Sequence, residues 1–213
     1  MLKIEKARPS IGYNWIHSVA AFRQFSTPQS QALKIGADPS RDPMLAAHCK
    51  HLMVVDVCEN RIPSGVKNAT YLVGDWQALA AVLPRNSIDI AVSDHVIEHV
   101  PDDIKAFNQL YEVLSPRGMA IIGTPNRRRL VRRVVEAFTG PKHFPTGTTA
   151  QDHVREYDWK DIHETIAKTA FKRFEVIPIG LGIMGGPLHV YLTKVPGSLR
   201  NWAGHWEIRL YKQ

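Results

Sequence analysis

Residues 87–126 read SIDIAVSDHVIEHVPDDIKAFNQLYEVLSPRGMAIIGTPN and contain the clearest pattern of secondary structure in the chain. Two apolar runs, 87–93 and 118–124, flank a segment in which five apolar residues recur at helical spacing: Ile104, Phe107, Leu110, Tyr111 and Leu114. Pro101 fits the first helical turn, and Asp102 and Asp103 suit the positive end of a helix. The stretch therefore predicts a buried strand, a helix packed through one apolar stripe, and a second buried strand.

The same rhythm extends in both directions along the chain. Short apolar runs, apolar on both faces as buried parallel strands are, occur at 32–36, 51–57 and 69–74. Downstream, Asp158 to Ala170 is predicted as a helix with Asp158 near its cap, and two further strands are predicted at 173–180 and 205–211. Strands that alternate with helices predict one α/β domain with a Rossmann-like, doubly wound, mostly parallel sheet.

Three segments stand outside this alternation and are predicted as additions to a single domain over 1–213. Residues 1–30 are expected to form a helical extension, with Trp15, Ile16, Val19 and Phe22 at helical spacing. Residues 140–157 read as a long loop, and residues 180–204 as a glycine-rich bend with a short helix over PLHVYLTKV. The last two are expected to lie on the substrate side.

The composition of the chain indicates its cellular compartment and the partners with which its charge is compatible. The chain has 213 residues, two cysteines and a formal charge of +7, much of it concentrated in RRRLVRR at 127–133. The N-terminus, MLKIEKARPS, lacks the apolar core of a signal peptide, and no apolar run approaches the roughly 20 residues of a membrane span. We expect a cytoplasmic protein. The charge is compatible with nucleic acid, phospholipid or a phosphorylated substrate.

Acidic residues follow two of the predicted strands. In open parallel sheets ligands bind beyond the carboxyl ends of the strands. Asp56 ends the second strand, about 20 residues after the first strand's loop, where an acid can accept hydrogen bonds from ribose hydroxyls. Asp75 follows the third strand and can accept a bond from an adenine amino group, with Trp76 beside the ring. Asp56 also fits a helix cap, and Asp75 a common turn.

These motifs together resemble the small class I S-adenosylmethionine-dependent methyltransferases, of the type 11 kind. DHVIEHVPDD (94–103) resembles their EH-hydrophobe-PD segment, and LSPRGMAIIGTPN (114–126) their L-x-P-G-G strand followed by TPN. HVREYDWKDI (153–162) resembles the segment that follows in many members. The resemblance covers roughly residues 30–180 in order. It implies a seven-stranded sheet with an antiparallel last strand, and S-adenosylmethionine at the first strand ends, near Gly36, Asp38 and Ser93 besides Asp56, Asp75 and Trp76.

The first loop departs from the family's hydrophobe-(D/E)-hydrophobe-G-x-G-x-G pattern. It reads LKIGADPS, so Lys34 replaces the acid, while Asp38 and Ser40 replace the second and third glycines. Asp tolerates a left-handed conformation and Ser is small, so the loop can keep its path. The family's acid helps to hold the methionine end of the cofactor, a role that Asp38 would have to take.

HVIEH at 95–99 also spells HxxEH, an inverted zinc-protease signature. On a helix His95 and His99 would share one face at ligand spacing. The segment directly follows a buried strand, Pro101 comes two residues after it, and no third ligand downstream is evident. We therefore expect no metal, and structural hydrogen bonds for Glu98 and His99.

For a hydroxyl acceptor, methyl transfer needs in-line positioning and a base. His95 at the fourth strand end and His153 are the two candidates, each equally compatible with a structural role. Arg127–Arg133 continue into an amphipathic helix, which can lie on an anionic membrane, bind a lipid-linked phosphate, or simply pack on the sheet.

The leading hypothesis is an O-methyltransferase acting on a small molecule or a sugar or lipid-linked glycan, with contact to an anionic membrane as an option. The first alternative is a methyltransferase-like binding or scaffolding protein that no longer catalyses, because the first loop is altered. The second is a nucleic-acid methyltransferase, suggested by the +7 charge. It lacks support because the chain has no (N/D/S)-P-P-(Y/F) segment and neither cysteine sits in a catalytic setting.

Overall fold

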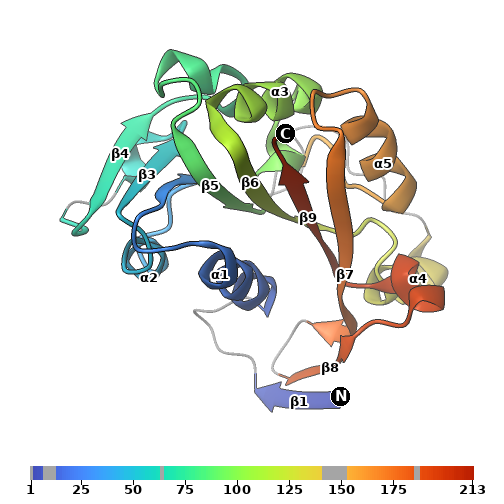
Figure 1. The fold of residues 1–213 in the computed structure, drawn as a ribbon. Helices are drawn as coiled ribbons and strands as arrows, with labels where there is room; N and C mark the ends of the chain where they lie inside the picture. Colours follow the sequence, from blue (N-terminus) through green and yellow to red (C-terminus); the bar gives the residue numbers. More distant parts are fainter. Residues whose placement is uncertain (1, 7–12, 63–64, 141–152, 185–187) are drawn as a thin grey trace.

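The computed structural model describes residues 2–6, 13–62, 65–140, 153–184 and 188–213 (Figure 1). All of its strands belong to one mixed sheet in the order β1-β8-β7-β9-β6-β5-β2-β3-β4. Their bounds are β1 Leu2–Lys6, β2 Gln31–Ile35, β3 His51–Asp56, β4 Ala69–Val73, β5 Ile88–Asp94, β6 Leu114–Pro125, β7 Arg173–Met184, β8 Leu188–Lys194 and β9 His205–Tyr211. The helices are α1 Tyr13–Phe25, α2 Asp42–Ala46, α3 Asp103–Val113, α4 Leu130–Thr139 and α5 Trp159–Ala167.

Seven of the strands form the predicted Rossmann-like arrangement. β4, β3, β2, β5 and β6 are parallel, and β9 lies antiparallel between β6 and β7. Numbered by their order within this set, the strands run 3-2-1-4-5-7-6. The α/β fold class and the antiparallel last strand are confirmed.

Helices cover both faces of the sheet, and the alternation of side chains along each strand feeds two cores (Figure 1). Leu33 and Ile35 of β2 point to the core that holds Phe107 of α3 and Ile162 of α5. Ala32, on the opposite face, joins the core under α1 and α2. Because side chains alternate along a strand, Lys34 also faces the α1 and α2 layer.

The helix over 103–113 is well explained by its sequence. The Asp102 side chain accepts a hydrogen bond from Lys105 N, and Phe107 and Leu110 are buried, so the predicted stripe is the packed face. In α5, Asp158 and Asp161 form a capping box, which confirms the predicted cap.

The sheet is larger than the sequence predicted. The short helix expected over 187–195 is wrong in its described part: Leu188–Lys194 form β8, antiparallel to β7. The predicted helix within residues 1–30 is present as α1, but Leu2–Lys6 form a strand against β8. Alternating apolar and polar residues such as those of LHVYLTK suit a strand, and the long β7, which runs to Met184, provides the edge against which β8 pairs. Of the predicted loop, residues 141–152 lie outside the described residues.

Candidate functional site

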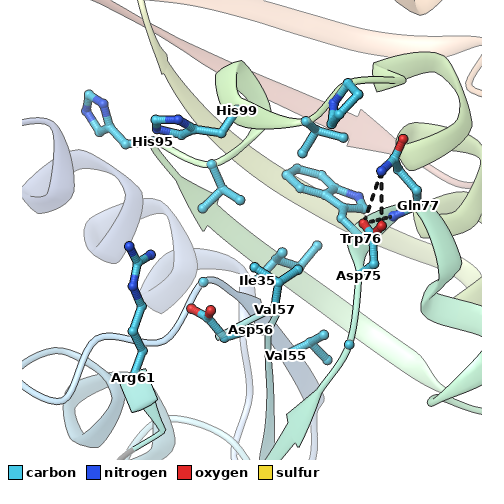
Figure 2. Close-up of a pocket in the computed structure, with 15 residues that line it drawn as sticks. Ile35, Val55, Asp56, Val57, Arg61, Asp75, Trp76, Gln77, His95 and His99 are labelled. Carbon is cyan, nitrogen blue, oxygen red and sulfur yellow. Dashed lines mark hydrogen bonds between the residues drawn. The ribbon is translucent and has the colours of Figure 1, made fainter. Parts of the chain in front are cut away.

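A cavity of about 650 Å³ opens at the carboxyl ends of the parallel strands, at the point where strand order reverses between β2 and β5. Figure 2 shows Asp56 and Arg61 on one side of it, His95 and His99 on another, and Asp75, Trp76 and Gln77 on a third. The size and placement are those of a cofactor or small-ligand site. Five predicted site residues line this cavity: Gly36, Asp56, Asp75, Trp76 and His95.

The Asp56 carboxylate is held rigidly at the end of β3. Oδ2 accepts a hydrogen bond from Ala37 N, and Oδ1 accepts one from Cys58 N, both at 2.8 Å. A carboxylate oxygen has two lone pairs, so each oxygen keeps one for a ligand in the cavity. The side chain therefore presents a fixed, bidentate acceptor, the arrangement that suits a pair of ribose hydroxyls.

Gly36 carries the chain from β2 into the first loop. Its φ is +88°, and a Cβ built on it would lie 2.7 Å from Val96 Cγ2. Glycine alone meets both requirements without strain. The first loop therefore keeps the one glycine that its path needs, although two of the family's three are replaced.

Lys34, which stands where the family has an acid, does not line the cavity. Its Nζ lies 2.8 Å from Asp42 Oδ1 and also donates to the carbonyl oxygen of Gly36. Asp42 is fully buried and accepts further bonds from Tyr71 Oη and from Asp38 N. The altered loop thus contains a buried ion pair between β2 and α2 that the sequence did not suggest.

Asp38 and Ser93 were predicted to touch the cofactor, but neither is part of the cavity wall. The Asp38 carboxylate accepts bonds from the backbone N–H and hydroxyl of Ser40 and pairs with Arg41. The Ser93 hydroxyl donates to the carbonyl oxygen of Ile35 and ties β5 to β2. Both side chains stabilise the loop from outside the cavity.

Asp75 and Trp76 form the wall beyond β4. The Asp75 carboxylate caps the 3-10 turn Trp76–Ala81 by accepting from Gln77 N, and it is also bonded by the Gln77 side chain (Figure 2). Trp76 is buried and meets Phe107 edge to face. Gln77, which the sequence reading did not single out, is a further polar group facing the cavity.

His95 has an unusual setting at the end of β5. Its φ is +55°, uncommon for a residue other than glycine, and its Nδ1 lies 3.2 Å from Glu98 Oε1. Burial lowers the pKa of His95, but the Glu98 contact and the charges of Glu98 and Asp94 outweigh it and raise the pKa overall. Strained histidines with a carboxylate partner are typical of functional sites.

Asp94 lies beside His95 and accepts a bond of 2.6 Å from the Ser18 hydroxyl of α1. Burial raises the pKa of Asp94 to about 6, although the Ser18 bond and the charges of His95, Lys34 and Arg41 oppose the rise. Ser18, which no sequence pattern indicated, thus connects α1 to the end of β5.

His153, the second predicted catalytic histidine, does not line the cavity. Its ring lies edge to face against His99, with 4.8 Å between centroids, and its Nδ1 lies 3.3 Å from Glu156 Oε1. The backbone N–H groups of Val154 and Arg155 donate to the Glu98 carbonyl oxygen, which fixes this segment against the one after β5.

The HxxEH segment is not an α-helix. Only Ile97–His99 form a single 3-10 turn, as the nearby Pro101 led us to expect. His95 and His99 therefore do not form the helical pair of a zinc protease.

The arginine cluster is largely committed to internal ion pairs. Arg127 and Arg128 pair with Asp158, while Arg129 and Arg132 pair with Glu156. On α4, three apolar side chains are exposed nonetheless: Val134, Val135 and Phe138, the last at 87%. Membrane or phosphate contact through Arg127–Arg133 stays a prediction. Among the described residues, no helix combines the length and apolar character that crossing a bilayer requires.

Comparison with known proteins agrees with this geometry. Residues 35–122 match the family model described as "Methyltransferase domain", and no curated protein matches the chain. A methyltransferase dependent on S-adenosylmethionine (SAM) from Thermotoga maritima superposes with a TM-score of 0.67 at 19% identity, over 94% of this chain and 90% of that chain. One from Archaeoglobus fulgidus gives 0.64 at 11% identity, over 93% and 94%.

A structure of Haemonchus contortus phosphoethanolamine N-methyltransferase 2 in complex with SAM gives a TM-score of 0.58 at 21% identity, over 77% of this chain and 38% of that chain. At these identities the likeness concerns the fold. Together with the family match over residues 35–122, it agrees with the SAM-dependent methyltransferase fold that the sequence motifs predicted.

Proposed function

We propose that this chain is a class I methyltransferase that binds SAM in the cavity beyond β2, β3 and β4 and transfers its methyl group to an acceptor oxygen. The observation that carries the proposal is the Asp56 carboxylate, held by two backbone N–H groups at 2.8 Å and facing the cavity. An acid in this position after the second strand of a Rossmann-like sheet is suited to a ribose diol.

The other walls suit the remaining parts of the cofactor. The positive φ of Gly36 lets the backbone come close to a ligand, and the carboxylate of Asp75 and the amide of Gln77 offer hydrogen-bonding groups to a base. Ile35, Val55 and Val96 supply apolar contacts. These groups all line the same cavity, so the residues present fit the cofactor.

Lys34 is compatible with SAM binding in the cavity. Its charge is neutralised by Asp42 on the α1 and α2 face of the sheet, away from the cavity wall. The residue changes in the first loop therefore affect the contacts behind the cavity wall more than the residues that line the cavity.

The acceptor side of the proposal rests on His95. When bound, SAM supplies a methyl group already activated on a sulfonium, so the protein has to orient the acceptor and remove its proton. His95 lines the cavity from the end of β5 (Figure 2). Its Nδ1 lies 3.2 Å from Glu98 Oε1, so Glu98 orients the ring. We assign the general base to His95, because the other candidate, His153, lies outside the cavity wall.

A hydroxyl acceptor of a small molecule or a sugar or lipid-linked glycan is the class we propose first. The base supports it, because an amine acceptor is nucleophilic once neutral, whereas a hydroxyl needs help with its proton.

Calorimetric titration with SAM tests the proposal. We expect one binding site in the native chain, retained in His95→Ala, which should lose turnover rather than cofactor affinity. Absence of binding at millimolar cofactor would end the enzyme proposal and favour the scaffolding alternative.

The alternative of a nucleic-acid methyltransferase rested on charge. Four of the arginines in 127–133 are paired with acids, which leaves less free charge for phosphates than the sequence implied. A salt-dependent mobility shift with RNA or DNA would revive it.

A further inference from the structure

We propose that Glu98, His99 and His153 form a binding site for a divalent transition-metal ion of the zinc type, next to the cofactor cavity. One ligand atom from each of these residues lies within 4.8 Å of the others. Two imidazoles and one carboxylate suit zinc and related divalent ions, and a three-ligand set leaves a position open for water or substrate.

The Glu98 carboxylate is the buried acidic ligand of this cluster. The side chain is 0% exposed, and its Oε2 accepts a bond of 3.2 Å from the Thr124 hydroxyl. Among the described residues no donor meets hydrogen-bond geometry to Oε1, although His95 Nδ1 approaches to 3.2 Å. His95 therefore compensates the carboxylate in part, and Oε1 keeps lone-pair capacity with which it can also bind a metal ion.

His153 is oriented as a metal ligand is. Its Nδ1 faces Glu156, 3.3 Å away, so Nε2 is the nitrogen whose lone pair can bind an ion. Glu156 is in turn fixed by Arg129 and Arg132. Metal-binding histidines commonly donate their other N–H to a carboxylate held in this way, which sets the tautomer and the ring direction.

The backbone brings the three ligands together from segments 54 residues apart. The bonds from Val154 N and Arg155 N to the Glu98 carbonyl oxygen, of 2.9 and 3.2 Å, hold the His153 segment against the turn Ile97–His99. Ligand atoms about 2.1 Å from one ion lie roughly 3 to 3.5 Å apart. Side-chain rotations that move each ligand atom by about an ångström therefore bring the three atoms to metal-binding distance.

The position adds to the proposed function, on which this consequence depends. His99 lines the cofactor cavity, so an ion at the site would lie beside the acceptor region with its open position available to an acceptor oxygen. A hydroxyl bound there loses its proton more readily. The acceptor's O–H proton passes to His95 or water, the oxygen bonds to the methyl carbon, and the electrons of the broken C–S bond remain on sulfur.

Metal binding is measured directly, without acceptor or cofactor. Chelator-treated protein is titrated with Zn²⁺ against a chromophoric competitor, and with Co²⁺ by visible absorption. We expect one equivalent to bind. Glu98→Gln and His153→Ala should each lower the affinity by at least about 100-fold, since changes to residues that only orient a ligand already cost about 10- to 100-fold. His51→Ala is the matched control, because His51 lies at the amino end of β3 and bonds Thr70.

Circular dichroism melts of the metal-free variants confirm that they fold. The proposal is overturned if the native chain binds less than one equivalent at 100 µM metal, or if folded Glu98→Gln and His153→Ala bind as tightly as the His51 control. A parallel SAM titration keeps this outcome apart from the proposed function. His153 lies outside the cavity wall, so its variant should bind SAM normally whether or not it binds metal.

Discussion

Breaking the buried ion pair between Lys34 and Asp42 should destabilise the protein far more than its surface ion pairs do. Both side chains are nearly inaccessible, at 6% and 0% exposure, and Nζ lies 2.8 Å from Oδ1. In Asp42→Asn, Tyr71 Oη and Asp38 N keep an acceptor, but the Lys34 charge stays buried without its partner. Removal of one member of such a pair costs about 3–5 kcal/mol, or roughly 6–20 °C in melting temperature for a chain of this size.

A double-mutant cycle isolates the interaction. Lys34→Met and Asp42→Asn should each cost about 3–5 kcal/mol, and the double variant clearly less than both losses together, with a coupling of about 2 kcal/mol or more. Free energies of unfolding come from urea titrations followed by circular dichroism, with unchanged m-values as the check on two-state behaviour. Lys160→Met is the matched control: its pair with Glu164 is 81% and 57% exposed, and its loss should cost at most about 0.5 kcal/mol.

The cycle also has a consequence for the first loop. Lys34→Glu restores the family's acid, yet it places a second carboxylate beside the buried Asp42, so it should destabilise more than Lys34→Met does. Two outcomes would refute a stabilising ion pair in this loop. One is that Lys34→Met and Asp42→Asn each cost under about 1 kcal/mol with additive effects in the double variant, and the other is that Lys34→Glu is more stable than the native chain.

Three further results are expected. Gly36→Ala should weaken cofactor binding and lower the free energy of unfolding by about 1–2 kcal/mol, because alanine is strained at the positive φ of this position. Adding Val96→Ala removes the clash with the new Cβ and should restore only part of the lost stability. Full restoration would contradict the claim that the positive φ itself requires glycine. Asp94 has a pKa of about 6 in the folded protein and near 4 in the unfolded chain. Its contribution to the free energy of unfolding is therefore fully present below about pH 4 and is lost as the pH rises through 6. Asp94→Asn should therefore gain about 1 kcal/mol relative to the native chain between pH 5 and 7.5, and parallel urea curves at the two pH values would contradict this. Most of the arginines in Arg127–Arg133 are paired to acids, so binding to vesicles of anionic lipid should depend more on the exposed Phe138 than on the salt concentration. In co-sedimentation, Phe138→Ser should lose binding while Val57→Ser keeps it, and equal binding by both variants would contradict a role for Phe138.

The sequence predicted the parts of the fold that local patterns control. Apolar runs with turn residues at their ends located the parallel strands, and the Asp102 and Asp158 caps located two helices, because these signals act within a few residues. It failed for Leu188–Lys194, where a strand depends on the edge that a distant strand offers.

The site divides in the same way. Asp56 was predictable, because its role follows from its place at a strand end. The pairing of Lys34 with Asp42 depends on which face of the sheet Lys34 occupies and on where α2 packs. The approach of His153 to Glu98 likewise depends on backbone hydrogen bonds between segments far apart in the chain, which no local pattern reveals.

The cavity at the carboxyl ends of β2 and β3 should bind SAM through Asp56, and SAM titrations of the native chain and of Asp56→Ala side by side measure this. Hydrogen bonds to a charged group contribute about 1.5–3 kcal/mol each, so loss of the carboxylate should weaken binding by at least about 10-fold. A single site in the native chain with that loss in the variant is the predicted result. Equal affinities in two equally stable proteins would contradict the account.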